Sequence, residues 1–173
     1  MFLCRAEVTV KGAAAAAPFR RTCAVLALAA SLAAASAAGA GTTRLTRTEQ
    51  SFVVAVNRIR SANALSPVAI DAKLVNAARF HSADMVEHGY FGHGAWDVRL
   101  ARFGAVGPRV GEDLGWAATA DPVGTIVREW LASPSHRAVL LRPGFRRVGI
   151  GVRVGPFRGW PRAVVVTADF EGR

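Results

Sequence analysis

Apolar positions follow a helical period through most of the chain after residue 45 and alternate near its C-terminus. Residues 46–49 have the form of a capping box, and Phe52, Val56 and Ile59 then repeat at intervals of four and three. The helix that this pattern predicts ends before Pro67, because the residue preceding a proline is pushed out of the helical region.

Two further helices are predicted before residue 104. Asp71 is a suitable N-cap and Gly89 a suitable stop, and the apolar face between them includes His81. A lone histidine on such a face is more often a hydrogen-bonded core residue than a ligand. A shorter apolar pattern over residues 96–103 predicts another helix, which Gly104 closes.

A pair of helices is predicted in the C-terminal half. An Asp-Pro step at residues 121–122 opens a helix that runs to about residue 131. Ser133 and Ser135 flank the proline that interrupts it, and a short second helix carries His136.

The last part of the chain has the pattern of a β-hairpin. Residues 146–154 and 163–170 alternate as strands do, and residues 155–161 are predicted to be the connecting loop. Helices followed by an antiparallel hairpin predict an α+β domain with helices packed on the faces of a small sheet.

Residues 1–40 have the features of a secretory leader. Arg20 and Arg21 precede an Ala-rich apolar run that ends in small residues with an Ala-x-Ala pattern. The alternative is a membrane anchor that is never removed, although the run is short and weakly apolar for a span. We expect residues 41–50 to form a linker and helix cap, residues 51–173 to form the domain, and the protein to be secreted, either extracellular or periplasmic.

The cysteine content and the net charge limit the kinds of site and of binding partner that the domain can have. Cys4 and Cys23 fall in the predicted leader, so the mature domain would have no disulfide, no thiolate nucleophile and no cysteine-ligated metal. The formal net charge is +10, and about +7 remains without residues 1–40, which hold four basic residues and one acidic residue. Such a surface favours anionic partners, such as phospholipid or an acidic cell-wall polymer. The alternative is a compositional preference for arginine, and the scattered arginines argue against nucleic acid as a partner.

Three short segments carry the candidate chemistry. His93 lies in an aromatic, glycine-flanked loop at residues 90–94, which suits a site residue, although a surface histidine is the alternative. Glu112 and Asp113 lie between glycines, and in an extended segment only one of them can face a cleft. We expect His93, Glu112 and His136 to meet in one cleft.

Two imidazoles and a carboxylate suit either a metal such as zinc or acid–base chemistry. The sequence has no His-x-x-x-His or His-Glu-x-x-His spacing, so such ligands would have to come together through the fold. Ser133 and Ser135 are close to His136, but both are natural helix caps, which makes a serine nucleophile the less favoured interpretation.

Four pieces of the chain carry a family resemblance. They are, in order, AARFHSADM, YFGH, GEDLGW and EWLASPSHRAVLLRPGFRRVGIGV. With these pieces in this order, the chain resembles the CAP superfamily (cysteine-rich secretory proteins, antigen 5 and pathogenesis-related 1), in particular its short bacterial SCP-domain branch. The resemblance runs from about residue 53 to residue 170. It implies an α-β-α sandwich, with helices on both sides of a small antiparallel sheet and a central cleft.

The family's cleft usually holds two histidines and two glutamates. His93, Glu112 and His136 match three of these four positions, and Ser133 stands where the second glutamate is expected. Asp113 replaces the asparagine of the family's Gly-Glu-Asn motif. Because some relatives bind zinc or magnesium, the resemblance makes His93 and His136 the candidate metal ligands.

Two functions follow as expectations. The first is a secreted, monomeric ligand-binding module for a lipid, a glycan or a cell-wall component, with Tyr90, Trp116, Asp113 and Ser133 beside the cleft. The alternative is a peptidase-like or cell-wall hydrolase in which a histidine acts as general base and Glu112 orients it or holds a metal-bound water. A purely structural role for these residues is the third interpretation. The sequence favours the binding module.

Overall fold

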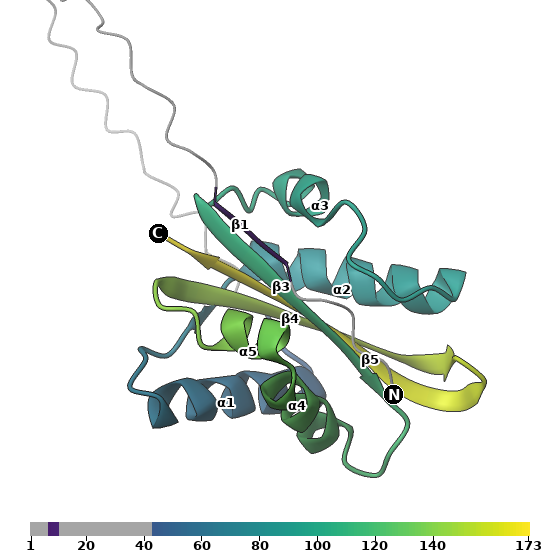
Figure 1. Cartoon of the computed structure of the whole chain (residues 1–173). Coiled ribbons are helices and arrows are strands. Elements are labelled where there is room, and N and C mark those ends of the chain that lie inside the picture. Colours follow the sequence, from purple (N-terminus) through teal and green to yellow (C-terminus); the bar gives the residue numbers. More distant parts are fainter. Residues whose placement is uncertain (1–6, 11–42) are drawn as a thin grey trace, which may run out of the picture.

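The computed structural model describes residues 7–10 and 43–173, which form five helices and five strands. Most of the predicted leader, including Cys4 and Cys23, lies outside the described residues. The elements shown in Figure 1 are β1 (Glu7–Val10), α1 (Arg47–Ala62), β2 (Ala69–Ile70), α2 (Ala72–His88), α3 (Trp96–Arg102), β3 (Arg109–Ala117), α4 (Pro122–Ala132), α5 (Pro134–Leu140), β4 (Phe145–Phe157) and β5 (Trp160–Gly172).

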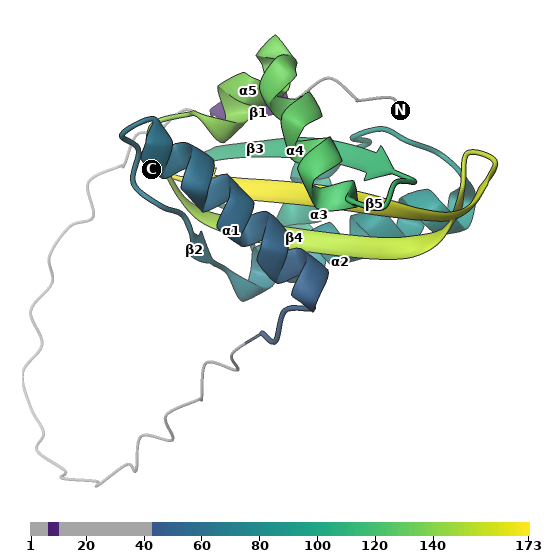
Figure 2. The same cartoon turned by 90° about the horizontal axis from the view of Figure 1, so that it is seen from below.

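One sheet separates two layers of helices. Its strand order is β1-β3-β5-β4-β2, with antiparallel neighbours except for the two-residue strand β2, which runs parallel to β4. Helices α2 and α3 cover one face, and α1, α4 and α5 cover the other (Figures 1 and 2). The predicted α-β-α sandwich is therefore confirmed, with one short parallel pair that the sequence analysis did not predict.

Local signals in the sequence explain where the helices begin and end. Thr46 and Glu49 form the predicted capping box at the start of α1. The carboxylate of Asp71 accepts two main-chain hydrogen bonds at the start of α2, and Gly89 ends that helix in the left-handed conformation at φ 68°. These caps direct the chain after α2 into the loop that carries His93.

The predicted hairpin loop is wrong in length. Both strands continue through most of residues 155–161, so that only Arg158 and Gly159 form the turn, with φ values of 50° and 85°. Pro156 stays in β4 because the ladder has an irregularity at this point, where a missing main-chain N–H is tolerated.

The core is apolar on both sides of the sheet. Phe52 and Trp130 pack with ring centroids 5.8 Å apart between the sheet and helices α1 and α4. Met85 and Leu114 anchor a second cluster beneath α2. Within residues 7–10 and 43–173, none of the helices has the length and apolar character needed to cross a membrane.

Candidate functional site

The loop between α2 and α3 brings His93 against Glu112 of β3. The Nδ1 atom of His93 lies 2.6 Å from Oε1 of Glu112. Only 7% of His93 and none of Glu112 is exposed, so this is a buried imidazole–carboxylate pair. Because the carboxylate accepts at Nδ1, it fixes the ring orientation and turns the other ring nitrogen away from Glu112.

Arg99 of α3 completes this arrangement from the opposite side of the carboxylate. Its guanidinium donates to Oε2 of Glu112 and, at 3.1 Å, to the main-chain carbonyl of His93. One arginine therefore compensates the buried carboxylate and holds the histidine loop in place. Charge-assisted hydrogen bonds of this kind are the stronger class in proteins.

Asp169 of β5 adds a second carboxyl group to the same face of the sheet. It is paired with Glu112 across the ladder, and it lies 3.9 Å from Arg99 and is fully buried. Burial raises the pKa of Asp169 well above its usual range, and the negative charge of Glu112 raises it further. Burial and the charge of Glu112 thus both favour the protonated form of Asp169, and the guanidinium of Arg99 offsets the carboxylate of Glu112.

His81 and Tyr90 support the histidine loop. The Nε2 atom of His81 lies 3.0 Å from the carbonyl oxygen of Gly92, and the hydroxyl of Tyr90 donates to Asp84 and lies 3.4 Å from Nδ1 of His81. Burial, with the charge of Arg99 as a second cause, lowers the pKa of His81 to about 3, so this ring is neutral. His81 is a hydrogen-bonded core residue, as its place on an apolar helix face indicates, and Tyr90 is half-buried beside it.

His136 lies in a second pair, at the start of α5. Its Nδ1 atom is 2.7 Å from Oγ of Ser133, which in turn lies 3.2 Å from Oγ of Ser135. Ser133 occupies the N-cap position of α5, but its side chain makes no capping hydrogen bond there. Ser133 therefore takes the N-cap position that the sequence predicts, but its hydroxyl lies against the imidazole instead of making a capping hydrogen bond.

Asp113 points to the face of the sheet opposite Glu112, as strand alternation requires. It lies between Gly111 and Gly115, where an added Cβ would meet side chains of β4, α4 and α5. Its carboxyl oxygens are buried and have no hydrogen-bond partner among the residues that the structure describes. Burial raises the pKa of Asp113 well above its usual range, and the charge of Glu112 adds to this.

Trp116 is part of the buried apolar cluster that contains Met85 and Leu114. Only 5% of it is exposed, and its ring lies 5.6 Å from that of Phe157 in an edge-on arrangement. The structure thus pairs His93 with Glu112 and His136 with Ser133, and it directs Asp113 and Trp116 into the core.

The site is covered at the outer edge of the sheet. Strand β1 pairs antiparallel with β3 so that Glu7 is opposite Glu112 and Val10 is opposite Arg109 (Figure 1), and α5 lies against β1 (Figure 2). His136 is only 1% exposed. In this structure, His93, Glu112 and His136 are buried while β1 is paired with the edge of β3.

The residues do not fit a metal held by three protein ligands. Both oxygens of Glu112 are engaged, one by His93 and one by Arg99. Among residues 7–10 and 43–173, no three side chains of histidine, cysteine, aspartate or glutamate gather closely enough to hold a metal ion. We therefore derive no chemistry through a metal at this site.

Arg99 and Asp169 are the site residues that the sequence analysis missed. A signal for each was present, because both are ionisable residues at positions where the pattern is apolar. Arg99 shares the buried face of α3 with Trp96 and Leu100, and Asp169 follows a run of apolar residues in the last strand. A charged residue in such a place is usually paired with an opposite charge.

Comparisons with known proteins place this geometry in a family. The chain is 31% identical over 108 residues to the uncharacterized protein YkwD of Bacillus subtilis (strain 168), which covers 60% of this chain and 41% of that protein. It is 30% identical over 112 residues to the uncharacterized membrane protein YlbC of the same organism, which covers 62% of this chain and 32% of that protein. The chain thus spans less than half the length of these two relatives.

Solved structures show the same fold. An extracellular protein containing an SCP domain from Bacillus anthracis str. Ames superposes with a TM-score of 0.60 at 26% identity, over 75% of this chain and 45% of that chain. A cysteine-rich secretory protein from Staphylococcus aureus superposes with a TM-score of 0.61 at 20% identity, over 73% of this chain and 38% of that chain, which supports the fold alone. The model of the cysteine-rich secretory protein family, CAP, matches residues 53–170, and the chain therefore belongs to this family.

Proposed function

We propose that the protein is a secreted ligand-binding module that holds an extended, peptide-like segment of a cell-wall component along the outer edge of β3, beside His93 and Glu112. The observation that carries this proposal is the antiparallel pairing of β1 with β3 at Glu112. A sheet edge offers main-chain N–H and C=O groups that an extended peptide can use in the same way.

The buried charges beside this edge suit binding. Glu112 and Arg99 fix the ring of His93, so the imidazole can meet a polar group of the ligand without losing side-chain freedom. The guanidinium of Arg99 offsets the carboxylate of Glu112, and the raised pKa of Asp169 favours its neutral form, which suits a neutral peptide segment.

The predicted leader connects binding to export. It contains β1, so its removal would free the edge of β3 for another segment. The similarity to the extracellular SCP-domain protein of Bacillus anthracis supports secretion of this chain as well. The site would then be covered before processing and open afterwards.

Proline substitutions in β1 test this proposal in the full chain. In an antiparallel pair, successive residues turn their N–H groups alternately toward the partner and away from it. Only one of the two substitutions Val8→Pro and Thr9→Pro therefore removes a ladder hydrogen bond and releases β1 from β3. We call that protein the released variant, and the other substitution is its matched control. A labelled peptide with the sequence of residues 6–11 is expected to bind the released variant, and fluorescence anisotropy measures its affinity.

The parent chain is expected to bind this peptide far more weakly, because its own β1 competes at a high effective concentration. In the released variant, adding Glu112→Gln is expected to weaken binding, since it frees the ring of His93. Equal and negligible binding by both proline variants would contradict the proposal.

A hydrolase is the second candidate, and one contact favours it. Oγ of Ser133 lies 2.7 Å from Nδ1 of His136, a distance at which an imidazole can take the proton of a nucleophilic hydroxyl. A serine-reactive fluorophosphonate would label the parent and Ser135→Ala but not Ser133→Ala if this pair is catalytic. Equal labelling of all three, or labelling of none, would remove this candidate.

A further inference from the structure

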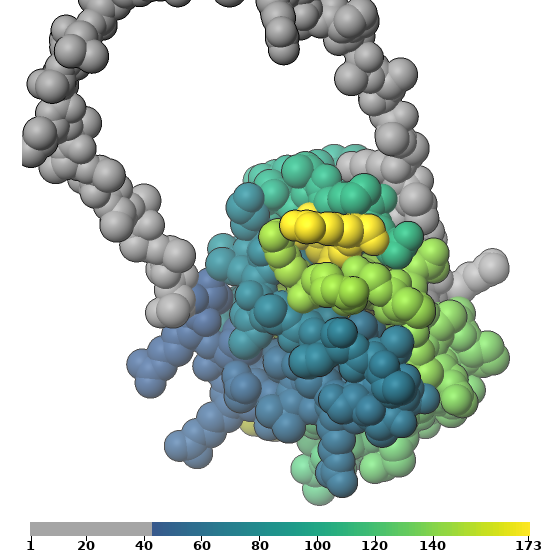
Figure 3. Space-filling model, turned by 90° about the vertical axis from the view of Figure 1, so that its left-hand side faces the viewer, coloured from purple at the N-terminus to yellow at the C-terminus, as the bar shows by residue number. Residues whose placement is uncertain are grey.

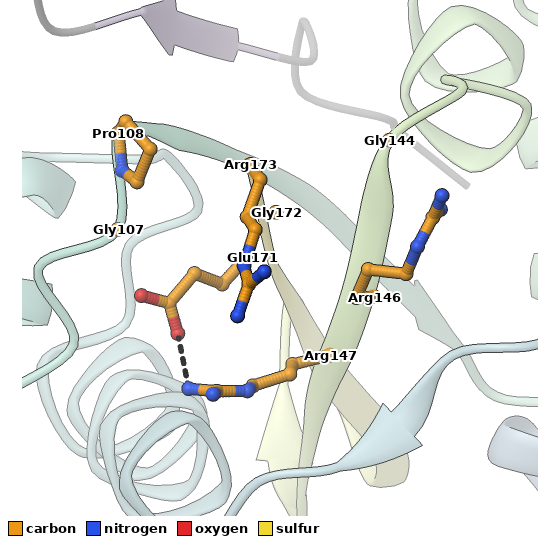
Figure 4. A pocket seen from close by; sticks show the side chains of 8 residues that line it. All are labelled: Gly107, Pro108, Gly144, Arg146, Arg147, Glu171, Gly172 and Arg173. Atoms are coloured by element: carbon orange, nitrogen blue, oxygen red, sulfur yellow. Dashed lines mark ion pairs between the residues drawn. The ribbon is translucent and has the colours of Figure 1, made fainter.

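A cavity of about 620 Å³ lies at the end of the sheet where β4 begins and β5 ends. Figure 3 views this end of the molecule, where the yellow C-terminal residues lie beside the light-green residues that lead into β4. We call it the arginine cavity, because three arginines and one acidic residue line it. Its lining consists of Gly107, Pro108, Gly144, Arg146, Arg147, Glu171, Gly172 and Arg173 (Figure 4).

The guanidinium of Arg147 lies close to two carboxylates, that of Glu171 in the cavity lining and that of Asp71 nearby. A guanidinium nitrogen of Arg147 lies 3.6 Å from Glu171 (Figure 4) and 3.5 Å from Asp71. Within residues 43–173, neither Arg146 nor Arg173 forms an ion pair with a carboxylate side chain. The one guanidinium of Arg147 is thus divided between two carboxylates, and the guanidinium groups of Arg146 and Arg173 have no carboxylate side chain as partner within these residues.

A buried cation adds to this positive charge. Arg60 of α1 is fully buried, and among the described residues its guanidinium donates only to main-chain carbonyls, those of Ser66, Leu140, Arg142 and Phe145. Arg146 donates to the carbonyl of Phe145 as well, at 3.0 Å. Burial lowers the pKa of Arg60, and the nearby charge of Arg146 lowers it further.

Arg60 and Arg146 both donate to the carbonyl oxygen of Phe145, and within the described residues neither forms an ion pair with a carboxylate side chain. Buried charges are normally paired, so a cation that has only carbonyl partners leaves a positive field at this end of the sheet. A bound anion at Arg146 would offset that field. Three of the arginines that are scattered in the sequence, Arg146, Arg147 and Arg173, meet at this cavity.

We propose that the arginine cavity is an anion-binding site for a phosphate ester, with Arg146 and Arg173 as its cationic ligands. Guanidinium groups match the geometry of phosphate oxygens and bind them with two hydrogen bonds. The cavity falls within the range of small-molecule sites and has room for more than a bare phosphate, so the ester carries a group about the size of glycerol or a sugar. This site shares no residue with the edge of β3 and does not rest on the function proposed above.

Calorimetric titration of the full chain with glycerol 1-phosphate tests the proposal. We expect saturable binding that weakens at least about tenfold in the double variant Arg146→Gln/Arg173→Gln, because charge-assisted hydrogen bonds are lost. The matched control is Arg153→Gln/Arg162→Gln, which removes the same charge from exposed positions elsewhere on the β4–β5 hairpin. Equal affinities in the two double variants, or no saturable binding by the parent, would overturn the proposal.

A gain-of-binding variant separates the site from any loss of folding. Glu171→Gln removes the one carboxylate of the lining, so affinity for glycerol 1-phosphate is expected to rise several-fold, and an unchanged or weaker affinity would overturn the proposal.

Vesicles then identify the source of the phosphate. Competition by phosphatidylglycerol vesicles, with phosphatidylcholine vesicles as the control, assigns the site to a lipid headgroup. Saturable binding of glycerol 1-phosphate without such competition assigns it to a soluble or polymer-borne ester, and both results support the anion site.

Discussion

Arg99 carries the charge balance of the histidine site. It compensates Glu112, which has no exposed surface, and it also donates to the main chain of the loop that holds His93. A buried carboxylate that loses its cationic partner keeps the full cost of its desolvation.

Replacing this arginine should therefore be costly. Arg99→Met is expected to lower the free energy of unfolding by about 3–5 kcal/mol, as measured by urea denaturation. Arg102→Met is the control in the same helix, where the exposed guanidinium lies over the ring of Phe80 and contributes about 1 kcal/mol or less. The double variant Arg99→Met/Glu112→Gln should recover much of the loss, and equal losses for the two single variants would contradict this account.

Asp113 gives a prediction with a defined pH dependence. Its folded-state pKa is raised, so the folded protein keeps this proton at pH values where the unfolded chain has released it. Its contribution to stability is therefore complete below pH ~4, near the unfolded pKa, and is lost as the pH rises toward the folded pKa.

The substitution Asp113→Asn is expected to remove the loss of stability that the parent suffers as the pH rises, because an amide does not ionise. At pH 7 the variant is expected to be more stable than the parent by about 1 kcal/mol or more, because the neutral amide takes up no proton on folding, whereas each unit of raised pKa costs the parent about 1.4 kcal/mol. The gain should shrink as the pH falls to 4 in parallel urea denaturation series. A variant that is less stable than the parent at pH 7 would show that the carboxylate is compensated after all.

At the scale of elements, the close packing of α2 on β4 is the main constraint. An added Cβ at Gly149 or Gly151 would clash with main-chain atoms of α2, at Leu74 and near Ala78. The helix therefore lies almost directly on the strand, and this contact also positions the loop that follows α2. Glycine is needed in both places for close approach, although neither has an unusual backbone conformation.

Alanine substitutions along one strand test this contact. Gly149→Ala is expected to cost about 3 kcal/mol or more, since a main-chain clash can be relieved only by moving the helix. Gly155→Ala is the matched control, because its Cβ would meet only a side-chain methyl of Val86 at 3.1 Å, and we expect about 1 kcal/mol or less. Thermal unfolding of the two variants measures the difference, and similar shifts in Tm would argue against the close contact.

At the scale of the whole molecule, the pairing of the buried charges predicts that the protein binds zinc only weakly. Because Glu112 is engaged by His93 and Arg99, we expect zinc titrated into the full chain to give the same weak heat as in a His93→Ala/His136→Ala variant. A chelator should likewise leave the Tm unchanged. Saturable binding of one zinc ion that is lost in the double variant would contradict this expectation and restore the metal interpretation.

Much of the architecture could be predicted because its signals are local. The capping box at Thr46, the N-cap Asp71 and the stop at Gly89 each act within a few residues, and each stands where the pattern predicted it. The hairpin was harder to predict, since Pro156 normally indicates a loop and only the irregular register of the ladder keeps it in a strand.

The sequence by itself determined the α+β class, the order of the helices, the family and the segments that carry His93, Glu112 and His136. Only the tertiary structure decided which groups meet: Arg99 on Glu112, Ser133 on His136, and β1 on the edge of β3. The physical reason is that caps and periodicity depend on neighbouring residues. Charge pairs and strand edges depend on how elements distant in the chain pack, and a pattern of residue types does not specify that packing.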